Sequence, residues 1–364
     1  MIKRIAAIAG LLLAFGLVGV IAIAIWPESA GTGDTRSANP DRALSAAGGA
    51  GANAITGDSG SPWREGGNLA ADLAKLRRPD DARFALQPTT ATPPVRYRFK
   101  HPPTAGILFD VRSGEVLWQR KPDLERPIAS LTKMMTALMV ARANSPDERV
   151  KISRNAAHTQ GSATGLLPQG RKVPLEALLK ALILISANDA AVALAEHNGG
   201  SVPRFIKQMN AHARGMGLTC THFSTPNGLR DRGNYSCPRD LAALARADLA
   251  NKRIAQIVQT PYAKPRFPIK GKRLYLTNNH YFLQRGLSGI PGAQVTGLKT
   301  GFTDPAGRCY VTTARLGSHH LGVVLLHSPM PLTQVPALLR AGFEEVGAIA
   351  PTAPALPVAP PPNG

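Results

Sequence analysis

Apolar residues recur with two different periods along the chain. In its middle part the period is three to four residues, which is typical of helices that bury one face. The expected helices cover residues 130–142, 175–185, 189–197, 202–216 and 238–251. On either side of this part the apolar residues form short runs bounded by turn residues, which predicts strands.

The expected strands lie at both ends of the same domain. Residues 105–119 predict a β-hairpin. Residues 295–301 form a further β-like run, and residues 309–317 and 320–328 predict a second hairpin before a closing helix at 332–346. This order predicts an α+β fold, with an antiparallel sheet built from both ends of the domain and a helical insertion between them.

The segments outside this domain differ in composition. Residues 5–26 are uncharged and apolar, and at ~1.5 Å per residue they are long enough to cross a bilayer. Their length favours an N-terminal membrane anchor within residues 1–26 over a cleaved signal sequence. Residues 27–95 have the composition of a flexible linker, residues 96–348 form the folded domain, and residues 349–364 are a Pro-rich tail.

The formal net charge is +20, and +19 of it lies in residues 96–364. A domain this basic is suited to nucleic acid, to anionic lipid or to an anionic polymer. Lys3 and Arg4 precede the apolar run, so the positive-inside rule places the domain on the periplasmic face of the inner membrane. Cleavage after the apolar run would release the domain into the periplasm. In either location we expect no nucleic-acid partner.

Three cysteines are too few to build a disulfide scaffold. Cys220 and Cys237 form a disulfide in one interpretation, and in the other they are buried thiols like Cys309. No Cys-x-x-Cys or His-x-x-x-His spacing occurs. We therefore expect no metal site and no cofactor.

A lysine lies within the apolar pattern of residues 130–142. Ser130 stands at the expected start of this helix, and Lys133 follows one turn later on the same side. Burial and the helix dipole both lower the pKa of such a lysine, and a neutral amine can activate a serine nucleophile. Alone the pair is weak evidence, because a capping serine and a lysine that reaches solvent give the same spacing.

Two more short motifs follow in order. Ser186 and Asn188 lie between two expected helices, where they can project into a cleft, although helix capping uses the same residue types. Lys299, Thr300 and Gly301 end a β-like run. The lysine and hydroxyl suit a carboxylate, and the glycine lets a ligand approach the backbone. All three motifs in this order are far rarer by chance than any one alone.

These motifs resemble the S-x-x-K, S-x-N and K-T-G signature of penicillin-binding proteins and class A β-lactamases. The fuller resemblance is to the D-alanyl-D-alanine carboxypeptidases, the low-molecular-mass penicillin-binding proteins of the S11 peptidase type. It is carried by the runs RPIASLTKMMTALM, SANDAA, HFSTPNGL and GLKTGFTDPAGRC, and it spans about residues 100–345. The resemblance implies a β-lactamase/transpeptidase-like fold.

The resemblance also implies a serine carboxypeptidase that removes the terminal D-Ala from peptidoglycan stem peptides and is acylated by β-lactam antibiotics. By position, Ser130 is the nucleophile, Lys133 its general base and Ser186 part of a proton relay. The backbone N–H groups of Ser130 and Phe302 are expected to form the oxyanion hole. The implied substrate-binding residues are Asn188, Lys299, Thr300, Gly301 and Phe302.

Three other functions fit parts of the pattern. A class A β-lactamase needs a glutamate between the second and third motifs, and only Glu196 lies there, without an E-x-x-L-N context. A non-catalytic wall-binding protein would not need Ser130, Lys133, Ser186 and Lys299 together. A DD-endopeptidase, which cuts peptidoglycan cross-links, stays open.

The chain departs from the family pattern in two ways. One leaves the choice between carboxypeptidase and endopeptidase activity open, and the other concerns carboxylate binding. The expected domain ends near Phe343, without the second domain and amphipathic helix that many members carry. In the segment before K-T-G, where the family often has a basic residue, this chain has Asn278 with His280 close by. We therefore expect carboxylate recognition to be weaker or rearranged.

Overall fold

The computed structural model describes residues 81–87, 92–229 and 232–350. The expected anchor, most of the expected linker and nearly all of the Pro-rich tail lie outside the described residues. Within the part that is described, no helix combines the length and the apolar character needed to cross a membrane.

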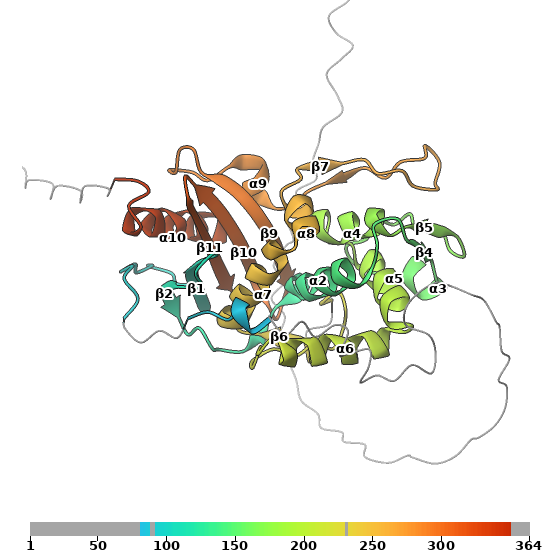
Figure 1. The fold of residues 1–364 in the computed structure, drawn as a ribbon, viewed down its shortest axis with the longest axis horizontal. Coiled ribbons are helices and arrows are strands. Elements are labelled where there is room, and N and C mark those ends of the chain that lie inside the picture. Colours follow the sequence, from blue (N-terminus) through green and yellow to red (C-terminus); the bar gives the residue numbers. More distant parts are fainter. Residues whose placement is uncertain (1–80, 88–91, 230–231, 351–364) are drawn as a thin grey trace, which may run out of the picture. The chain divides into compact units, whose positions relative to one another are not determined.

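Five antiparallel strands form the main sheet, in the order β2–β1–β11–β10–β9. Two strands come from the start of the domain and three from its end, so the sheet joins distant parts of the chain (Figure 1). The predicted α+β class and the sheet built from both ends are confirmed. The strands are β1 (Ala105–Asp110), β2 (Val116–Arg120), β9 (Gln294–Thr303), β10 (Gly307–Leu316) and β11 (His319–Leu326).

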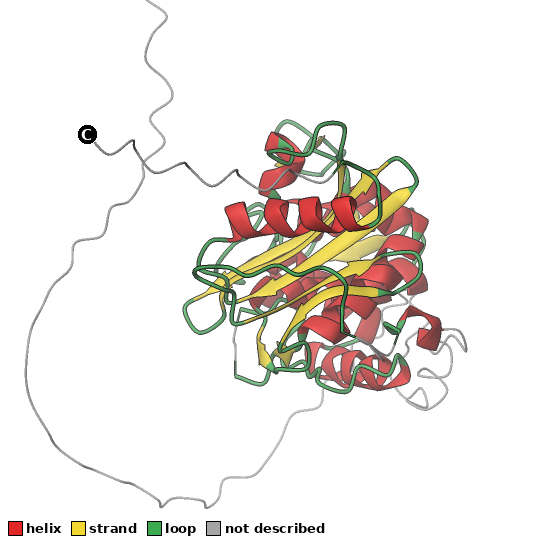
Figure 2. Cartoon of the chain, turned by 90° about the vertical axis from the view of Figure 1, so that its left-hand side faces the viewer, coloured by secondary structure: helices red, strands yellow, loops and turns green. Residues whose placement is uncertain are grey.

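The sheet separates two apolar clusters, because alternate residues of a strand point to opposite faces. Ile107 and Phe109 of β1 belong to the cluster shared with the helical lobe. Leu108 between them belongs to the other cluster, which is shared with α10 (Pro331–Glu345). Figure 2 shows α10 lying across the strands on its own side of the sheet.

The helical lobe surrounds α2 (Lys133–Ala143), whose residues are buried from Lys133 to Val140. A helix that is apolar around most of its circumference belongs inside a domain, and α2 packs against α4, α5 and α7. The helices are η1 (Asp81–Phe84), η2 (Ala129–Thr132), α3 (Arg154–Ala157), α4 (Leu175–Leu184), α5 (Asn188–Gly199), α6 (Val202–Gly215), α7 (Pro238–Ala250), α8 (Lys252–Val258) and α9 (Tyr281–Arg285).

The prediction missed three small two-stranded sheets and placed the start of one helix wrongly. The expected helix at 130 begins as the 3-10 turn η2, and regular α-helix starts only at Lys133. The reason is a sharp turn at Ala129, where φ is 48°. The small sheets pair β3 (Arg126–Pro127) with β6 (Tyr235–Ser236), β4 (Arg149–Lys151) with β5 (Lys172–Pro174), and β7 (Tyr262–Ala263) with β8 (Leu276–Thr277).

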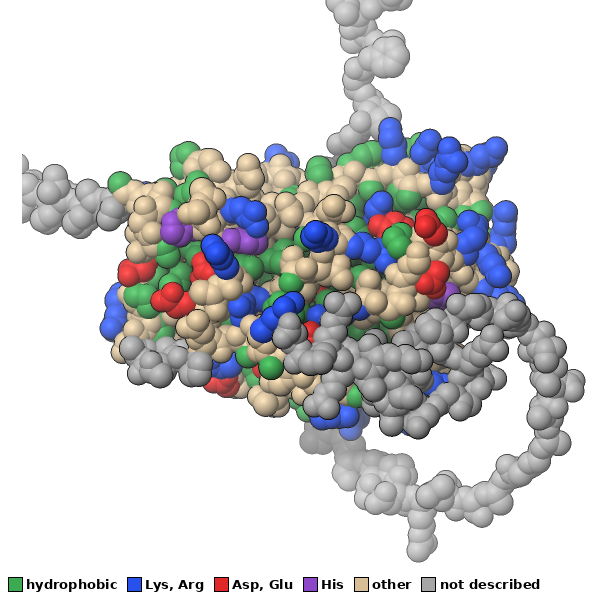
Figure 3. Space-filling view, viewed as in Figure 1, with side chains coloured by type: hydrophobic (Ala, Val, Ile, Leu, Met, Phe, Trp, Pro, Cys, Tyr) green, Lys and Arg blue, Asp and Glu red, His purple; other side chains and the backbone are tan. Residues whose placement is uncertain are grey.

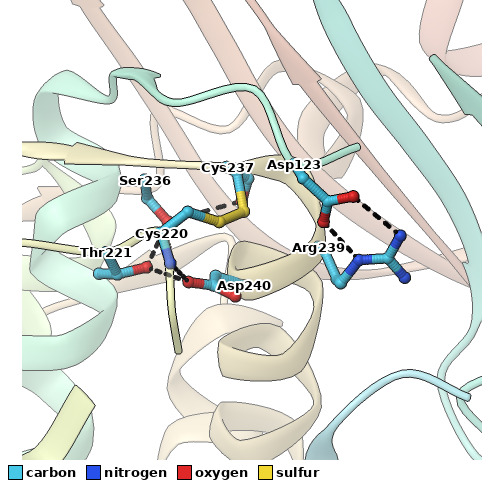
Figure 4. Close-up of a disulfide and its surroundings, with 7 residues drawn as sticks. All are labelled: Asp123, Cys220, Thr221, Ser236, Cys237, Arg239 and Asp240. Atoms are coloured by element: carbon cyan, nitrogen blue, oxygen red, sulfur yellow. Dashed lines mark hydrogen bonds and ion pairs between the residues drawn. A yellow bond between two sulfur atoms is a disulfide. The ribbon is translucent and has the colours of Figure 1, made fainter. Parts of the chain in front are cut away.

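A disulfide joins Cys220 to Cys237, with 5.8 Å between the Cα atoms (Figure 4). Cys237 is the residue directly before α7, and Asp240 in the first turn of α7 accepts hydrogen bonds from Cys220 N at 2.9 Å and Thr221 Oγ1 at 2.7 Å. The structure therefore favours the paired interpretation of these two cysteines. The link and the hydrogen bonds together tie the segment after α6 to the start of α7.

Replacing both Cys220 and Cys237 with alanine should lower the free energy of unfolding by ~2–4 kcal/mol, because the link closes a loop in the unfolded chain. Urea denaturation followed by circular dichroism measures this change. Dithiothreitol should destabilise the parent protein by a similar amount and leave the double variant unaffected. Equal stability of parent and variant would contradict the prediction.

Candidate active site

Ser130 lies in the η2 turn, directly before α2. Ala129 has a positive φ, which is uncommon for a residue other than glycine. The turn is fixed from outside by Gly228, where an added β-carbon would lie 1.9 Å from the Ala129 carbonyl oxygen. Inside the turn, Thr132 Oγ1 donates to that same oxygen at 2.9 Å. Backbone contacts therefore set the position of Ser130.

Lys133 is the first residue of α2, and its side chain is only 1% exposed. Its Nζ lies 2.9 Å from Ser130 Oγ, 2.7 Å from Asn188 Oδ1 and 2.7 Å from the Asn227 carbonyl oxygen. A neutral amine has two N–H groups and one lone pair. Asn188 and Asn227 accept the two N–H groups, which leaves the lone pair to accept a hydrogen bond from the Ser130 hydroxyl.

The surroundings of Lys133 favour this neutral form. Burial is the largest cause that lowers its pKa well below the ordinary value, and the positive charge of Lys299 lowers it further. The Asp189 carboxylate opposes these two effects. Asp189 is itself occupied, since it accepts hydrogen bonds from Thr164 N and Gly165 N in the neighbouring loop.

Ser186 and Asn188 lie at the junction of α4 and α5. The Asn188 side chain links Lys133 to the rest of the lobe, because its Nδ2 donates to the Gln160 carbonyl oxygen at 3.1 Å. Ser186 has a φ of 59°, and its buried hydroxyl finds no hydrogen-bond partner among the described residues. A buried hydroxyl without a partner is costly, so Ser186 is suited to bond a ligand or a reacting group.

Lys299 and Thr300 lie in β9, at the edge of the main sheet. Lys299 is 4% exposed, and its Nζ donates to the Thr300 carbonyl oxygen at 3.0 Å. Burial lowers the pKa of Lys299 to about 7. A buried ammonium that donates to a single carbonyl among the described residues gains much from a carboxylate that binds beside it.

Strand β9 lies against the Ser130 turn at Gly301. A β-carbon there would lie 3.0 Å from both the Ile128 carbonyl oxygen and the Ser130 nitrogen. The glycine therefore lets β9 pass close to the η2 turn, and its role in admitting a ligand stays a prediction. The next residue, Phe302, has a side chain that is 63% exposed. The N–H groups of Ser130 and Phe302 thus belong to two segments in contact.

The structure brings the three motifs together. Lys133 contacts Ser130 and Asn188 directly, and the pKa of Lys133 responds to the charge of Lys299. Ser186 lies two residues before Asn188, while Thr300 and Phe302 flank Gly301 in the strand that touches the turn. The arrangement brings together the Ser130 hydroxyl beside a buried amine, a second buried lysine and a buried hydroxyl without a partner among the described residues.

Two residues at the site were missed from the sequence. Asn227 supplies a carbonyl to Lys133, and Gly228 allows its loop to pass over Ala129. Both belong to the run HFSTPNGL, whose Pro-Asn-Gly sequence is typical of a turn. That signal locates a turn but does not say which element it touches.

Asn278 does not take the place of a basic residue. Its Nδ2 donates to the Val258 and Thr260 carbonyl oxygens, and its Oδ1 accepts from His280 N. Burial, with a smaller contribution from Lys299, lowers the pKa of His280 to about 4. Neither Asn278 nor His280 therefore brings a second positive charge to Lys299.

The described residues contain one group of three side chains close enough to share a metal ion, namely Cys220, Cys237 and Asp240. Its two sulfur atoms form the disulfide. The group includes none of the residues that meet around Lys133.

Known proteins are similar to this chain in sequence and in fold. A family model described as D-alanyl-D-alanine carboxypeptidase matches residues 88–329. DacF, a D-alanyl-D-alanine carboxypeptidase of Bacillus subtilis, is 31% identical over 253 residues, which cover 67% of this chain and 63% of DacF. The D-alanyl-D-alanine endopeptidase of Escherichia coli is 31% identical over 223 residues, which cover 61% of this chain and 70% of that protein. The chain thus spans less than two thirds of the length of DacF.

A solved structure shows the same fold. The D-alanyl-D-alanine carboxypeptidase of Mycobacterium tuberculosis is 30% identical, with a TM-score of 0.63 over 73% of this chain and 98% of that one. The fold, the sequence similarity and a family model that covers well over half of the chain agree. The chain belongs to the D-alanyl-D-alanine carboxypeptidase family of serine peptidases.

Proposed function

We propose that this protein is a serine DD-carboxypeptidase that removes the terminal D-Ala from peptidoglycan stem peptides. The observation that carries the proposal is the 2.9 Å contact between Ser130 Oγ and the buried Lys133 amine. An amine whose pKa is lowered by burial is a base at neutral pH. Membership of the family supports the choice of substrate.

In this mechanism Lys133 takes the proton of Ser130 as the serine oxygen attacks the carbonyl carbon of the penultimate D-Ala. The backbone N–H groups of Ser130 and Phe302 stabilise the oxyanion. Ser186 helps to pass the proton to the nitrogen of the leaving D-Ala. Water then hydrolyses the acyl-enzyme ester, and a β-lactam acylates Ser130 by the same first step.

Substrate binding rests on two groups. The Lys299 ammonium and the Thr300 hydroxyl bind the terminal carboxylate of the peptide. The Asn188 amide holds the peptide backbone while its Oδ1 keeps its contact with Lys133. Because Lys299 is positively charged when it binds a carboxylate, it also helps to keep Lys133 neutral.

A DD-endopeptidase that cuts cross-links is the second candidate. It is favoured by the match to the Escherichia coli endopeptidase, of which the alignment covers 70%. A class A β-lactamase is disfavoured by the position of Glu196. This glutamate lies two turns along α5 from Asn188, and its Oε1 accepts a hydrogen bond from Asn155 Nδ2 at 2.8 Å.

The proposed substrate lies outside the cytoplasm, in the cell wall. We place the domain, residues 96–348, on the periplasmic face of the inner membrane, held there by residues 5–26 through the linker 27–95. The uncharged run of residues 5–26 and the two basic residues before it support this location.

Replacing Lys133 with alanine should slow acylation of Ser130 by ~10²–10⁴-fold, the usual contribution of a general base. Labelling with a fluorescent penicillin measures acylation, and circular dichroism checks that the fold persists. Ser130→Ala should give no label, and Lys252→Ala, which removes an exposed lysine, should label normally. Normal labelling of Lys133→Ala would contradict the assigned role.

The value of kcat/KM for an N-acylated tripeptide ending in D-Ala-D-Ala should fall as pH rises through about 7. The Lys299 pKa in the free enzyme is lowered to about 7, so the cation that binds the carboxylate is lost above that pH. Initial rates at constant ionic strength give the profile. Lys299→Gln should have a lower kcat/KM without this alkaline decline. A parent profile that stays flat to pH 9 would disprove the assignment.

Digestion of purified peptidoglycan should release free D-Ala while the amount of cross-linked dimers stays constant. Chromatography of the released muropeptides, with an enzymatic assay for D-Ala, separates the two products. Ser130→Ala should release nothing. Loss of dimers without free D-Ala would instead identify an endopeptidase.

A further inference from the structure

The hairpin that contains β7 and β8, residues 262–277, carries an unusual charge. No Asp or Glu occurs between Asp248 and Asp304, an interval that contains nine lysines and arginines. The five basic residues of the hairpin are all exposed, and none forms an ion pair with a described residue. They are Lys264, Arg266, Lys270, Lys272 and Arg273. Figure 3 shows Lys and Arg side chains gathered over this hairpin at the upper right.

The two faces of the hairpin differ. Tyr262 lies opposite Thr277, and Arg266 lies opposite Arg273, so the residues between them pair in the same register. One face carries Phe267, Leu274 and Leu276, which are buried. The hairpin is thus anchored by its apolar face and presents the other face to solvent.

We call the solvent face of the hairpin the basic ribbon; its residues are Tyr262, Lys264, Arg266, Arg273 and Tyr275. The side chains of Tyr262 and Tyr275 are 46% and 65% exposed. Their rings lie 6.5 Å apart, between centroids. Tyrosine presents a rigid apolar ring with a polar end, which suits it to binding surfaces.

No acidic side chain of a described residue pairs with the charges of the basic ribbon, although Arg273 Nη1 donates a hydrogen bond across the hairpin to the Lys264 carbonyl oxygen at 3.3 Å. Arg266 and Arg273 face each other directly across the two strands, and like charges in such a pair are destabilising. The hairpin is held in other ways, for example by Arg171 Nη1, which donates to the Pro268 carbonyl oxygen at 3.0 Å. A fixed face that concentrates like charge next to exposed aromatic rings is suited to an anionic partner.

Backbone contacts join the base of the hairpin to the segment that leads to Ser186. The residue after β8, Asn278, is bonded to the carbonyl oxygens of Val258 and Thr260. Asn279 N then donates to the Leu184 carbonyl oxygen at 2.8 Å, two residues before Ser186. A polymer that extends beyond the active site on this side would therefore meet the ribbon.

We propose that the basic ribbon is a second binding surface for the peptidoglycan polymer, which recognises free carboxylates of stem peptides away from the scissile bond. The tyrosine rings would lie against sugar rings of the same polymer, and the basic side chains would pair with the carboxylates. This inference rests on the proposed function, since it takes the wall polymer as the substrate. The ribbon would increase activity on polymeric peptidoglycan without changing activity on small peptide substrates.

The test compares two triple variants of the full chain in detergent. Lys264→Gln/Arg266→Gln/Arg273→Gln removes three charges from the basic ribbon. Arg96→Gln/Arg98→Gln/Lys100→Gln is the matched control, since these exposed residues also alternate along an extended segment, next to β2 at the opposite edge of the sheet from β9. All forms are sedimented with insoluble peptidoglycan at low and high salt, with Ser130→Ala added to prevent digestion.

The ribbon variant should bind peptidoglycan about three- to tenfold more weakly at low salt, because each exposed charge contact contributes a small factor that salt screens. The control should bind like the parent. With Ser130 intact, the ribbon variant should lose kcat/KM by a similar factor on polymer and keep the parent value on the small tripeptide. Penicillin labelling should be unchanged.

Three results would overturn the inference. The first is equal binding of peptidoglycan by all forms. The second is an equal loss of binding in the control variant, which would show that only the net charge matters. The third is an equal loss of kcat/KM on polymer and on tripeptide. Failure of the proposed function is distinguished from these, because it would appear as absence of D-Ala release in the parent. Sedimentation would still report whether the ribbon binds the polymer.

Discussion

Burial of the Lys133 amine is the constraint on which the rest of the site depends. An amine without solvent needs partners for each of its polar groups, and the structure supplies them from three separate segments. Asn188 comes from the start of α5, Asn227 from the loop before β6, and Ser130 from the η2 turn. Moving any one of these segments would leave a buried polar group without a partner.

Backbone conformation reflects the same constraint. Among the described residues, five that are not glycine have a positive φ, and two of them, Ala129 and Ser186, lie next to the groups around Lys133. Strained conformations persist only where surrounding contacts hold them, and they concentrate at functional sites. Here the contacts come from Gly228 on one side of the turn and Gly301 on the other, both close enough to exclude a β-carbon without displacement.

The sequence predicted the parts of this arrangement that depend on local pattern. Alternation and helical periods located the sheet strands and the main helices, and motif spacing identified Ser130, Lys133 and Asn188. It missed Asn227, because a carbonyl contact between segments far apart leaves no periodic signal. It also missed the hairpin of β7 and β8, because the charged solvent face interrupts the apolar pattern on which strand prediction depends.

The two buried lysines explain why the site needs its partners at fixed positions. Burial lowers the pKa of both lysines, and the positive charge of Lys299 lowers the pKa of Lys133 further. A proton on Lys299 therefore makes a proton on Lys133 less favourable. When a carboxylate pairs with Lys299, that proton is held more firmly, while Lys133 keeps its two acceptors and its lone pair toward Ser130. In the proposed mechanism one buried amine thus acts as a cation and the other as a base, although the two side chains are chemically identical, because burial and neighbouring charge lower their pKa values to different extents.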